Sequence, residues 1–464
     1  MTITHNAAPR LDRRAQHATL LAASLGFAVV QLDVFVVNVG VRQIGAALGG
    51  GTSGLQWVVS VYTLMFAALI LTSGALGDRF GARRVYCAGF VTFSAASLAC
   101  GLAPGIAALI GARAVQGVGA ALLAACSLAL INHTFHEPAE RARAVALWAA
   151  GASVALSAGP VIGGALIAGL GWRSIFFINL PISAAGVILA LRYAPPEQPA
   201  AHPIDTAGQV TAIVALGALA WALIEGGATG FTSLPVLAGL VVAAGSAACF
   251  LRLETVSDHP MLPLRLFRRP GFAGPAFLGL LVNIAFYGLI FVFSLLFQQE
   301  EGYSALKAGL AFLPMTTVIL AANLASRWAV ARAGVRRVIL VGLAAMAAGC
   351  AALLGAGVHT PYYLLAGQQV VLGGGIGLLV PPMTTTLMGS VDRSRSGVAS
   401  GTLNMMRQTG SVLGVAVFGS LIAAKARFTT GMHMSLLISI VVVVLAALVV
   451  WGTLGHQRGG GATG

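Results

Sequence analysis

Long apolar runs separated by short polar segments recur along almost the entire chain. The runs have the length that crosses a bilayer as a helix, about 17–25 residues, and apolar positions inside them do not alternate with polar ones. Hydrocarbon offers the backbone no hydrogen-bond partners, so such runs are helical, and the missing alternation excludes a β-barrel. The pattern predicts an all-α polytopic membrane protein with about 14 spans, at residues 19–39, 55–76, 84–102, 106–131, 143–168, 174–193, 208–226, 233–253, 272–297, 306–328, 335–356, 361–385, 398–424 and 434–454.

The composition agrees with lipid as the main solvent of this chain. Of the 464 residues, 58% are hydrophobic and 9% are charged, whereas a soluble domain carries about a quarter charged residues. The net charge of +14 does not indicate nucleic-acid binding, because the basic residues lie in short loops and form no stripe along a helix. The 5 cysteines lie in or beside apolar runs without a CxxC pair, so we interpret them as small hydrophobic residues.

The distribution of basic residues predicts the orientation in the membrane. An even number of spans places both termini on one side, and the loops on that side carry most of the basic residues, by roughly four to one. The loops of the other side carry only Arg42, Arg173, Lys307, Lys425 and Arg427. Because basic loops stay in the cytoplasm, we expect both termini to be cytoplasmic and the protein to lie in the bacterial inner membrane.

Two polar segments divide the chain into blocks. They lie at 195–199 and 252–269 and enclose the seventh and eighth spans. We therefore expect an N-terminal tail at 1–18, a six-helix bundle at 19–193, a linker with two extra transmembrane helices at 194–271, a second six-helix bundle at 272–454 and a C-terminal tail at 455–464.

A charged loop after the second span has a partial copy in the second half. The order Arg-x-Gly-x-Arg-Arg-Val occurs at residues 79–85 and again at 332–338, with Ala331 where the first copy has Asp78. Such duplication in a membrane protein predicts a transporter with two-fold pseudosymmetry. We interpret the first copy as a gating loop whose contacts exist in one of two states, although its arginines could also serve only to fix topology. Its residues are Gly74, Asp78, Arg79, Gly81, Arg83 and Arg84.

Five ordered segments resemble the Major Facilitator Superfamily, in its fourteen-span drug:proton antiporter branch. Besides the charged loop, these are Leu32-Asp33-Val34-Phe35-Val36-Val37-Asn38-Val39, Arg113-Ala114-Val115-Gln116-Gly117-Val118-Gly119-Ala120, Gly159-Pro160-Val161-Ile162-Gly163-Gly164 and Trp172-Arg173-Ser174-Ile175-Phe176-Phe177-Ile178-Asn179-Leu180-Pro181. Within that branch the chain is similar to methylenomycin-type antibiotic exporters. The resemblance implies a major facilitator fold of two six-helix bundles plus two additional helices between them, and proton-coupled efflux.

Three ionisable residues are candidates for proton coupling. Asp33 and Glu225 are the carboxylates that lie within apolar spans, and such acids usually serve proton or substrate pathways. The resemblance implies that Arg113 takes part through hydrogen bonds to backbone or to the first span. Two alternatives remain open: an arginine could hold Asp33 ionised purely for packing, and Glu225 could face water at the outer end of its span.

A second group of residues is expected to line the substrate cavity. It comprises Asn38, Phe35, Trp57, Tyr62, Gln116, Phe286, Tyr287, Asn404 and Arg407. Aromatic side chains suit amphipathic compounds, although any single one could instead face lipid or another helix. For Arg407 the sequence leaves three roles open: pairing with Asp33, meeting an anionic substrate group, or binding lipid phosphate.

Small residues in the fifth span are expected to act in helix packing and as a hinge. These are Gly159, Pro160, Gly163 and Gly164, since glycine permits close helix approach and proline bends a helix. His133, His136 and Glu137 lie together at a loop, but no further ligand type is nearby, so we expect no metal site.

The sequence thus predicts a drug:proton antiporter that works by alternating access and not an enzyme. Its expected partners are a small amphipathic or apolar drug or antibiotic, protons and the lipid bilayer. We expect a monomer with no cofactor, no metal and no nucleic acid. No nucleotide-binding motif is present, so ATP is not the expected source of energy for transport. The alternatives are a proton-coupled importer of a small metabolite on the same fold, and a membrane-embedded lipid-handling protein.

Overall fold

The computed structural model describes residues 12–195, 205–257, 260–262, 264–357, 360–392, 396–423 and 428–454, and every regular element in these ranges is helical. The predicted tails therefore lie largely outside the described residues, as does part of the linker. The α-helices are α1 (Arg13–Leu48), α2 (Gly51–Phe80), α3 (Ala82–Gly101), α4 (Ile106–Thr134), α5 (Pro138–Leu170), α6 (Ser174–Phe177), α7 (Asn179–Tyr193), α8 (Thr206–Thr229), α9 (Leu234–Val256), α10 (Pro270–Leu295), α11 (Ala305–Ala311), α12 (Leu313–Ala333), α13 (Val335–Leu353), α14 (Tyr362–Gly389), α15 (Ser396–Leu421) and α16 (Phe428–Leu454), with short helices η1 (Leu264–Arg268) and η2 (Leu296–Glu300).

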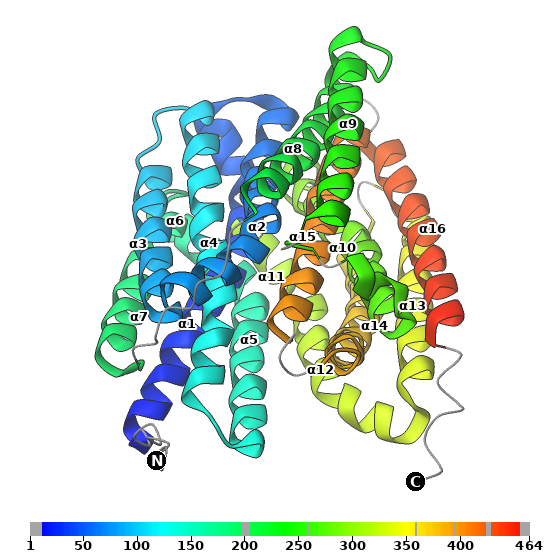
Figure 1. Cartoon of the computed structure of the whole chain (residues 1–464). Coiled ribbons are helices and arrows are strands. Elements are labelled where there is room, and N and C mark those ends of the chain that lie inside the picture. The colour runs from blue at the N-terminus through cyan, green and yellow to red at the C-terminus, as the bar shows by residue number, and fades with distance from the viewer. Residues whose placement is uncertain are drawn as a thin grey trace, which may run out of the picture.

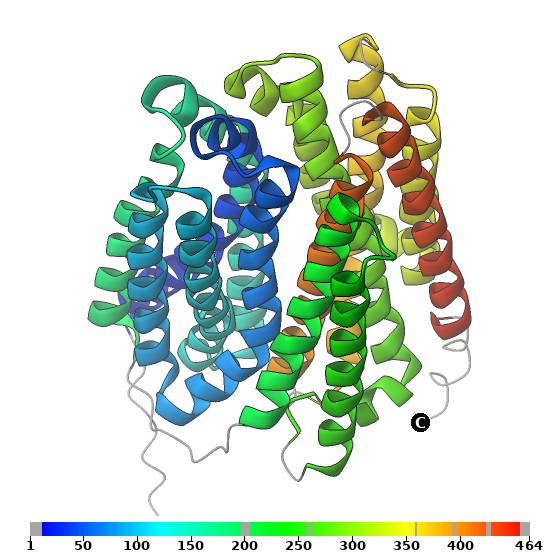
Figure 2. The same ribbon diagram turned by 90° about the horizontal axis from the view of Figure 1, so that it is seen from above.

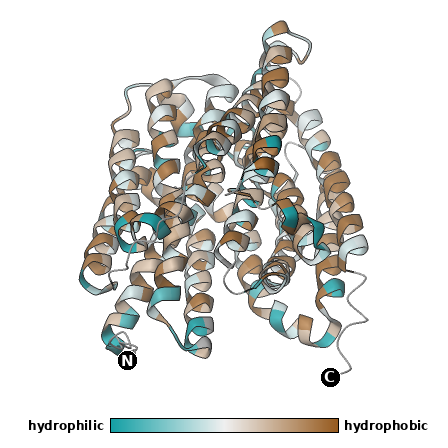
Figure 3. Cartoon of the chain, in the orientation of Figure 1, coloured by the Kyte–Doolittle hydropathy of each residue, from teal (hydrophilic) through white to brown (hydrophobic). Residues whose placement is uncertain are grey.

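The helices have the length and surface of membrane spans. Within the described ranges, 12 helical segments are long and apolar enough to cross a bilayer. Helices α3 and α15, with 20 and 26 residues, are long enough for two further spans but more polar. Helix α3 contains Arg83 in its first turn, and α15 contains Asn404 and Arg407. Hydrophobic residues cover most of the helix lengths (Figure 3). Large apolar side chains such as Val241, Leu324 and Trp451 are exposed, which requires lipid around them.

Prolines explain why two of the expected spans are broken. The span expected at 174–193 consists of α6 and α7, which meet at Ile178, and the span expected at 306–328 consists of α11 and α12, which meet at Phe312. Pro181 and Pro314 lie in the first turns of α7 and α12. Proline has no N–H for the preceding turn, so the hydrogen-bond ladder is interrupted there.

The helices form two groups with a pair between them. Figures 1 and 2 show α1–α7 on one side and α10–α16 on the other. Helices α8 and α9 pack against each other, and α8 also packs against α2 of the first group and α15 of the second. Direct contact between the two groups is made by α2 with α15 and by α5 with α11 and α12. This is the arrangement that the major facilitator fold implies.

The duplicated loop has the same local geometry in both groups. Gly81 and Gly334 have φ angles of 91° and 79°, values that favour glycine. Arg83 donates to the carbonyl oxygen of Ala194 at the end of α7, at 3.0 Å. Arg336 lies over the Trp451 ring of α16, 4.1 Å from its centre. In each group the loop arginine thus contacts the last helix of its own group. We call the end of the molecule that carries these loops the basic face.

Helices within the first group approach closely at glycines. A Cβ atom on Gly119 of α4 would lie 2.7 Å from the backbone nitrogen of Phe93 on α3. A Cβ atom on Gly111 of the same helix would meet nothing within 4 Å. The two positions therefore separate the effect of helix packing from the effect of adding a side chain.

We expect Gly119→Val to destabilise the protein and Gly111→Val to have little effect. Overpacking costs about 1–3 kcal/mol because α3 must move away from α4. Thermal unfolding of the two purified variants, followed by tryptophan fluorescence, measures the difference. Equal melting temperatures would show that the α3–α4 crossing tolerates an added side chain.

Candidate functional site

The centre of the first group contains a buried ion pair. Asp33 of α1 is fully buried, and Arg113 of α4 is 1% exposed. The Nη1 atom of Arg113 donates to Oδ2 of Asp33. The expected contact between Arg113 and the first span is therefore present. Such a pair is favourable in an apolar interior only when the remaining polar atoms are also satisfied.

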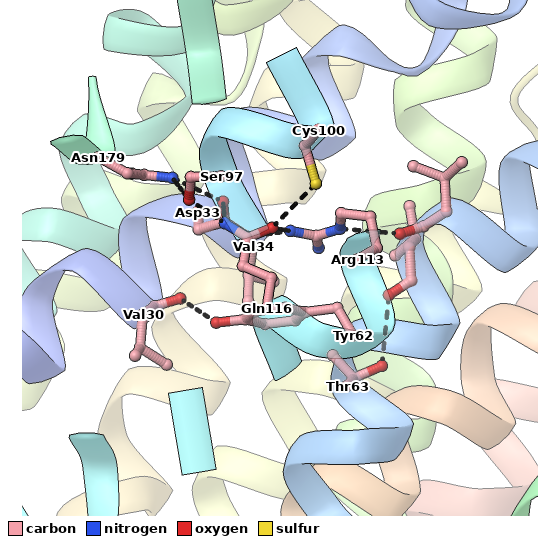
Figure 4. Close-up of polar contacts among 12 residues, drawn as sticks. Val30, Asp33, Val34, Tyr62, Thr63, Ser97, Cys100, Arg113, Gln116 and Asn179 are labelled. Carbon is pink, nitrogen blue, oxygen red and sulfur yellow. Dashed lines mark hydrogen bonds and ion pairs between the residues drawn. The ribbon is translucent and has the colours of Figure 1, made fainter. Parts of the chain in front are cut away.

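Neutral side chains supply the remaining partners of the carboxylate. Nε2 of Gln116 donates to Oδ1 of Asp33 at 2.8 Å, and Nδ2 of Asn179 donates to the same oxygen at 3.1 Å. Both amides also donate to the hydroxyl of Ser97. Figure 4 shows Asn179 and Arg113 approaching the carboxylate from opposite sides. The roles of Asn179 and Ser97 were not predicted, although an asparagine two residues before a proline in an apolar span was a usable signal.

Arg113 is held on its other side by α2. Its Nε atom donates to the carbonyl oxygen of Val58 at 3.1 Å, and its guanidinium lies 4.2 Å from the centre of the Tyr62 ring. The Tyr62 hydroxyl donates to the carbonyl oxygen of Val30 at 3.2 Å. Tyr62 and Gln116 thus belong to the ion-pair cluster, which joins α1, α2, α3, α4 and α7.

Away from the basic face, polar contacts join the two groups of helices. The Ser294 hydroxyl of α10 donates to the carbonyl oxygen of Asn38, and Arg42 donates to the carbonyl oxygen of Gln298 in η2. Nε2 of Gln56 donates to the carbonyl oxygen of Ala416 on α15 at 3.0 Å. All three acceptors are backbone carbonyls. One of them lies in η2, which is a π-helix, a form that is frequent at functional sites. We call the end of the molecule that carries these contacts, away from the basic face, the opposite face.

The glycines of α5 allow close packing on α1 and on α11 of the second group. A Cβ atom on Gly159 would lie 2.8 Å from Cβ of Phe35, and one on Gly163 would lie 3.0 Å from Val36, both on α1. A Cβ atom on Gly164 would lie 2.7 Å from the carbonyl oxygen of Ala305 on α11. The segment that includes Pro160 therefore packs on α1 with one side and on the second group with the other.

At the basic face the two groups are separated by a cavity of about 650 Å³. Its walls are the last turns of α2, which include Gly74 and Asp78, the end of α4, the first turns of α15, which include Asn404, and the residues Asp205, Pro260 and Met261. Arg79 and Arg84 nearby are exposed. Among the described residues, hydrogen bonds thus join the two groups at the opposite face, and a cavity lies between them at the basic face.

The remaining predicted cavity residues are distributed over several environments. Phe35 and Tyr287 are buried against each other across the α1–α10 contact, with ring centres 6.1 Å apart, and Phe286 is buried beside Tyr287. Trp57 packs in a separate cluster with Leu64, Ala220 and Val412. Of the residues expected to line the substrate cavity, Asn404 lies on the wall of the 650 Å³ cavity at the basic face, and the others do not.

The two other ionisable residues within spans lie apart from the ion pair. Glu225 is half-buried near the end of α8, and no hydrogen bond or ion pair between it and the Asp33 cluster is present among the described residues. Arg407 is half-buried on α15. Since Asp33 is paired with Arg113, pairing of Asp33 with Arg407 is not the arrangement in this structure.

Two groups of helices long and apolar enough to cross a membrane, with a cavity between them, define a polytopic membrane transporter. Residues 23–415 and 316–460 match the Major Facilitator Superfamily. The chain belongs to that superfamily.

Its relatives include proteins named for drug resistance. It is 38% identical to the multidrug resistance protein Stp of Mycobacterium tuberculosis (strain CDC 1551 / Oshkosh) over 91% of this chain and 78% of that protein. It is 36% identical to the methylenomycin A resistance protein of Streptomyces coelicolor over 93% of this chain and 91% of the relative. The crystal structure of the human organic anion transporter MFSD10 (TETRAN) matches the fold with a TM-score of 0.62 at 16% identity, covering 96% of this chain and 100% of that one.

We expect Arg113→Gln to destabilise the protein more than the double variant Asp33→Asn/Arg113→Gln. The single change leaves a carboxylate buried without its cation, which costs about 3–5 kcal/mol, whereas the double change removes both charges. Melting temperatures of the purified proteins at pH 8 measure the difference. Arg173→Gln is the control, because Arg173 is exposed. A double variant less stable than Arg113→Gln would contradict the coupling.

Proposed function

We propose that this protein is a proton-coupled efflux transporter that exports small amphipathic drugs or antibiotics from a bacterial cell. It exchanges substrate for protons by alternating access and catalyses no chemical reaction. The similarity to resistance proteins over more than nine-tenths of the chain supports export. A single chain supplies both helix groups around the interior, so the transporter acts as a monomer.

The observation that carries the proposal is the carboxyl group of Asp33 in the middle of an apolar bundle. It is fully buried, and its partners are one cation and two amides. A charged carboxylate in an apolar interior needs a balancing charge and hydrogen-bond donors, which Arg113 and the two amides supply in this state. In the proposed cycle a proton balances the carboxylate instead when rearrangement removes its contact with the arginine.

The proton moves down its gradient and supplies the work of export. One charge crossing a potential of 100 mV yields about 2.3 kcal/mol. Arg113 links the proton to helix movement because it contacts α1, α2 and α4 together. In this proposal the proton replaces Arg113 as the partner of Asp33 in one state.

The basic face is the cytoplasmic face in this proposal, as the positive-inside rule requires. Both termini then lie in the cytoplasm of a bacterial inner-membrane protein, and the cavity opens inward. In the other state the cavity closes, and Asp78 approaches the first turn of α15, where the helix dipole favours an anion. The glycines of α5 and Pro160 allow the two groups to move against each other at the opposite face.

We expect Asp33→Asn to abolish proton-driven efflux without preventing membrane insertion. A susceptibility panel of antibiotics and dyes, on cells with and without the gene, first identifies an exported compound. Uptake of that compound into energised everted vesicles, with and without an uncoupler, then measures coupling. The expected result is loss of uncoupler-sensitive uptake, because asparagine cannot bind and release a proton.

Glu225→Gln is the comparison variant for this test, since Glu225 is the second acid predicted to take part in coupling. We expect a smaller loss, because Glu225 has no polar contact with the Asp33 cluster among the described residues. Normal coupled efflux by Asp33→Asn refutes the proposed role of Asp33. Uptake of the compound into cells, driven by the proton gradient, would indicate the importer.

We expect Arg42→Ala to open the opposite face more often. Arg42 donates to backbone carbonyls of the other helix group, and loss of a charged hydrogen bond shifts a two-state equilibrium about tenfold. The rate at which an impermeant maleimide labels Asn38→Cys from outside, in a background without the native cysteines, measures the shift. Arg173→Ala is the control, because Arg173 lies on the same face and donates to Ala103 within its own group. Equal labelling rates in both variants would show that Arg42 does not hold the two helix groups together at the opposite face.

A further inference from the structure

We propose that Arg407 binds an acidic group of the substrate, so that the preferred substrates are organic anions. This inference rests on the proposed function and adds the charge class of the exported compound. The sequence left the role of Arg407 open among a protein carboxylate, a substrate anion and a lipid phosphate. The contacts of Arg407 favour the second of these.

Within the part of the chain that the structure describes, Arg407 has no counter-charge. Its Nε atom is buried and has no hydrogen-bond partner, and the structure gives it no ion pair among the described residues. The stem of the side chain lies against Gly279 of α10, where a Cβ atom would be 3.3 Å from Cγ of Arg407. Arg113, by contrast, is paired with Asp33 and also bonded to Gln116 and to a backbone carbonyl. The two intramembrane arginines therefore have different roles.

The position of Arg407 is suited to a substrate that enters from the cavity. It lies near the middle of the 26-residue helix α15. Gly397, Gly401 and Asn404 of that helix line the cavity at the basic face. Arg407 follows Asn404 by three residues and so lies on the same side of the helix, one turn deeper. A charge at this depth is costly unless it meets an opposite charge or water.

Two polar side chains from different helix groups, Gln31 of α1 and Tyr287 of α10, are buried where these two helices pack. The Tyr287 hydroxyl of α10 is within electrostatic range of Arg407 and interacts with the side chain of Gln31 on α1. Tyrosine and glutamine can both donate hydrogen bonds. Together with Arg407 they supply donors to a carboxylate or phenolate from α1, α10 and α15. A ligand bound by all three helices would contact both helix groups, which move against each other in the proposed cycle.

The charge balance near Arg407 favours an anionic substrate group. The carboxylate of Asp33 is already matched by Arg113, so the pair contributes no net negative charge. The acids Asp78 and Asp205 line the cavity at the basic face, and Glu225 lies near the end of α8. Among the described residues Arg407 has no ion pair, so a negative group of a substrate can balance its charge.

Binding of two dyes to purified protein tests the proposal without a proton gradient. Fluorescein is an anion at pH 7.5, rhodamine 123 is a cation, and both share the xanthene ring system. Fluorescence anisotropy in phosphatidylcholine nanodiscs, with empty nanodiscs subtracted, gives their dissociation constants. We expect tighter binding of fluorescein than of rhodamine 123. Arg407→Gln should weaken fluorescein binding about 10- to 100-fold, as loss of a charged hydrogen bond implies, and leave rhodamine 123 binding unchanged or tighter.

Three controls make the result specific. Arg407→Lys keeps the charge and should retain most of the affinity for fluorescein. Arg327→Gln removes a positive charge from an exposed position on α12 and should have no effect. Nanodiscs with added phosphatidylglycerol distinguish the source of the anion: if a lipid headgroup occupies Arg407, this lipid will compete with fluorescein.

The outcomes separate the two proposals. Failure of fluorescein to bind more tightly than rhodamine 123, equal effects of Arg407→Gln on both dyes, or competition by phosphatidylglycerol would overturn the anion site. None of these results bears on whether transport is coupled to protons, which the Asp33→Asn measurement decides. Conversely, selective binding of fluorescein through Arg407 would stand even if the direction of transport were reversed.

Discussion

The exclusion of water from the membrane interior is the constraint on which this structure depends. A charge placed there must be matched inside the protein, and the pair of Asp33 and Arg113 meets this condition with two amides and a hydroxyl. Because its members come from five helices, the cluster also fixes how α1–α4 and α7 pack. The same buried cluster thus supplies the group proposed to carry the proton and holds the helices of the first group together.

Among the described residues a buried ion pair lies within the first group, whereas hydrogen bonds and close glycine packing join the two groups. Within the first group an ion pair and close glycine packing join the helices. Between the groups, Ser294, Arg42 and Gln56 each donate to a backbone carbonyl. Water outside the membrane can replace a hydrogen bond of this type at little net cost. An interface built in this way can open, while each group of helices keeps its internal structure.

The two halves share an architecture but not a charge pattern. The loops at Gly81 and Gly334 have similar backbone geometry, and Arg83 and Arg336 each contact the last helix of their half. The first half contains a matched pair of charges, whereas Arg407 of the second half has no ion pair with any described residue. In the proposed mechanism the first half therefore handles the proton and the second half recognises the substrate.

The sequence alone determined the membrane environment, the helical class and the number of crossings, because the hydrophobic length of a span is a local property. It also identified Asp33, Arg113 and Gln116 as unusual, since polar residues in hydrocarbon are rare. Only the tertiary structure decided their partners: Asn179 donates to the carboxylate, Ser97 accepts from the amides of Asn179 and Gln116, and Trp57 packs elsewhere. Which residues meet across helices depends on how each helix is rotated, and that rotation is fixed by packing between segments distant in sequence.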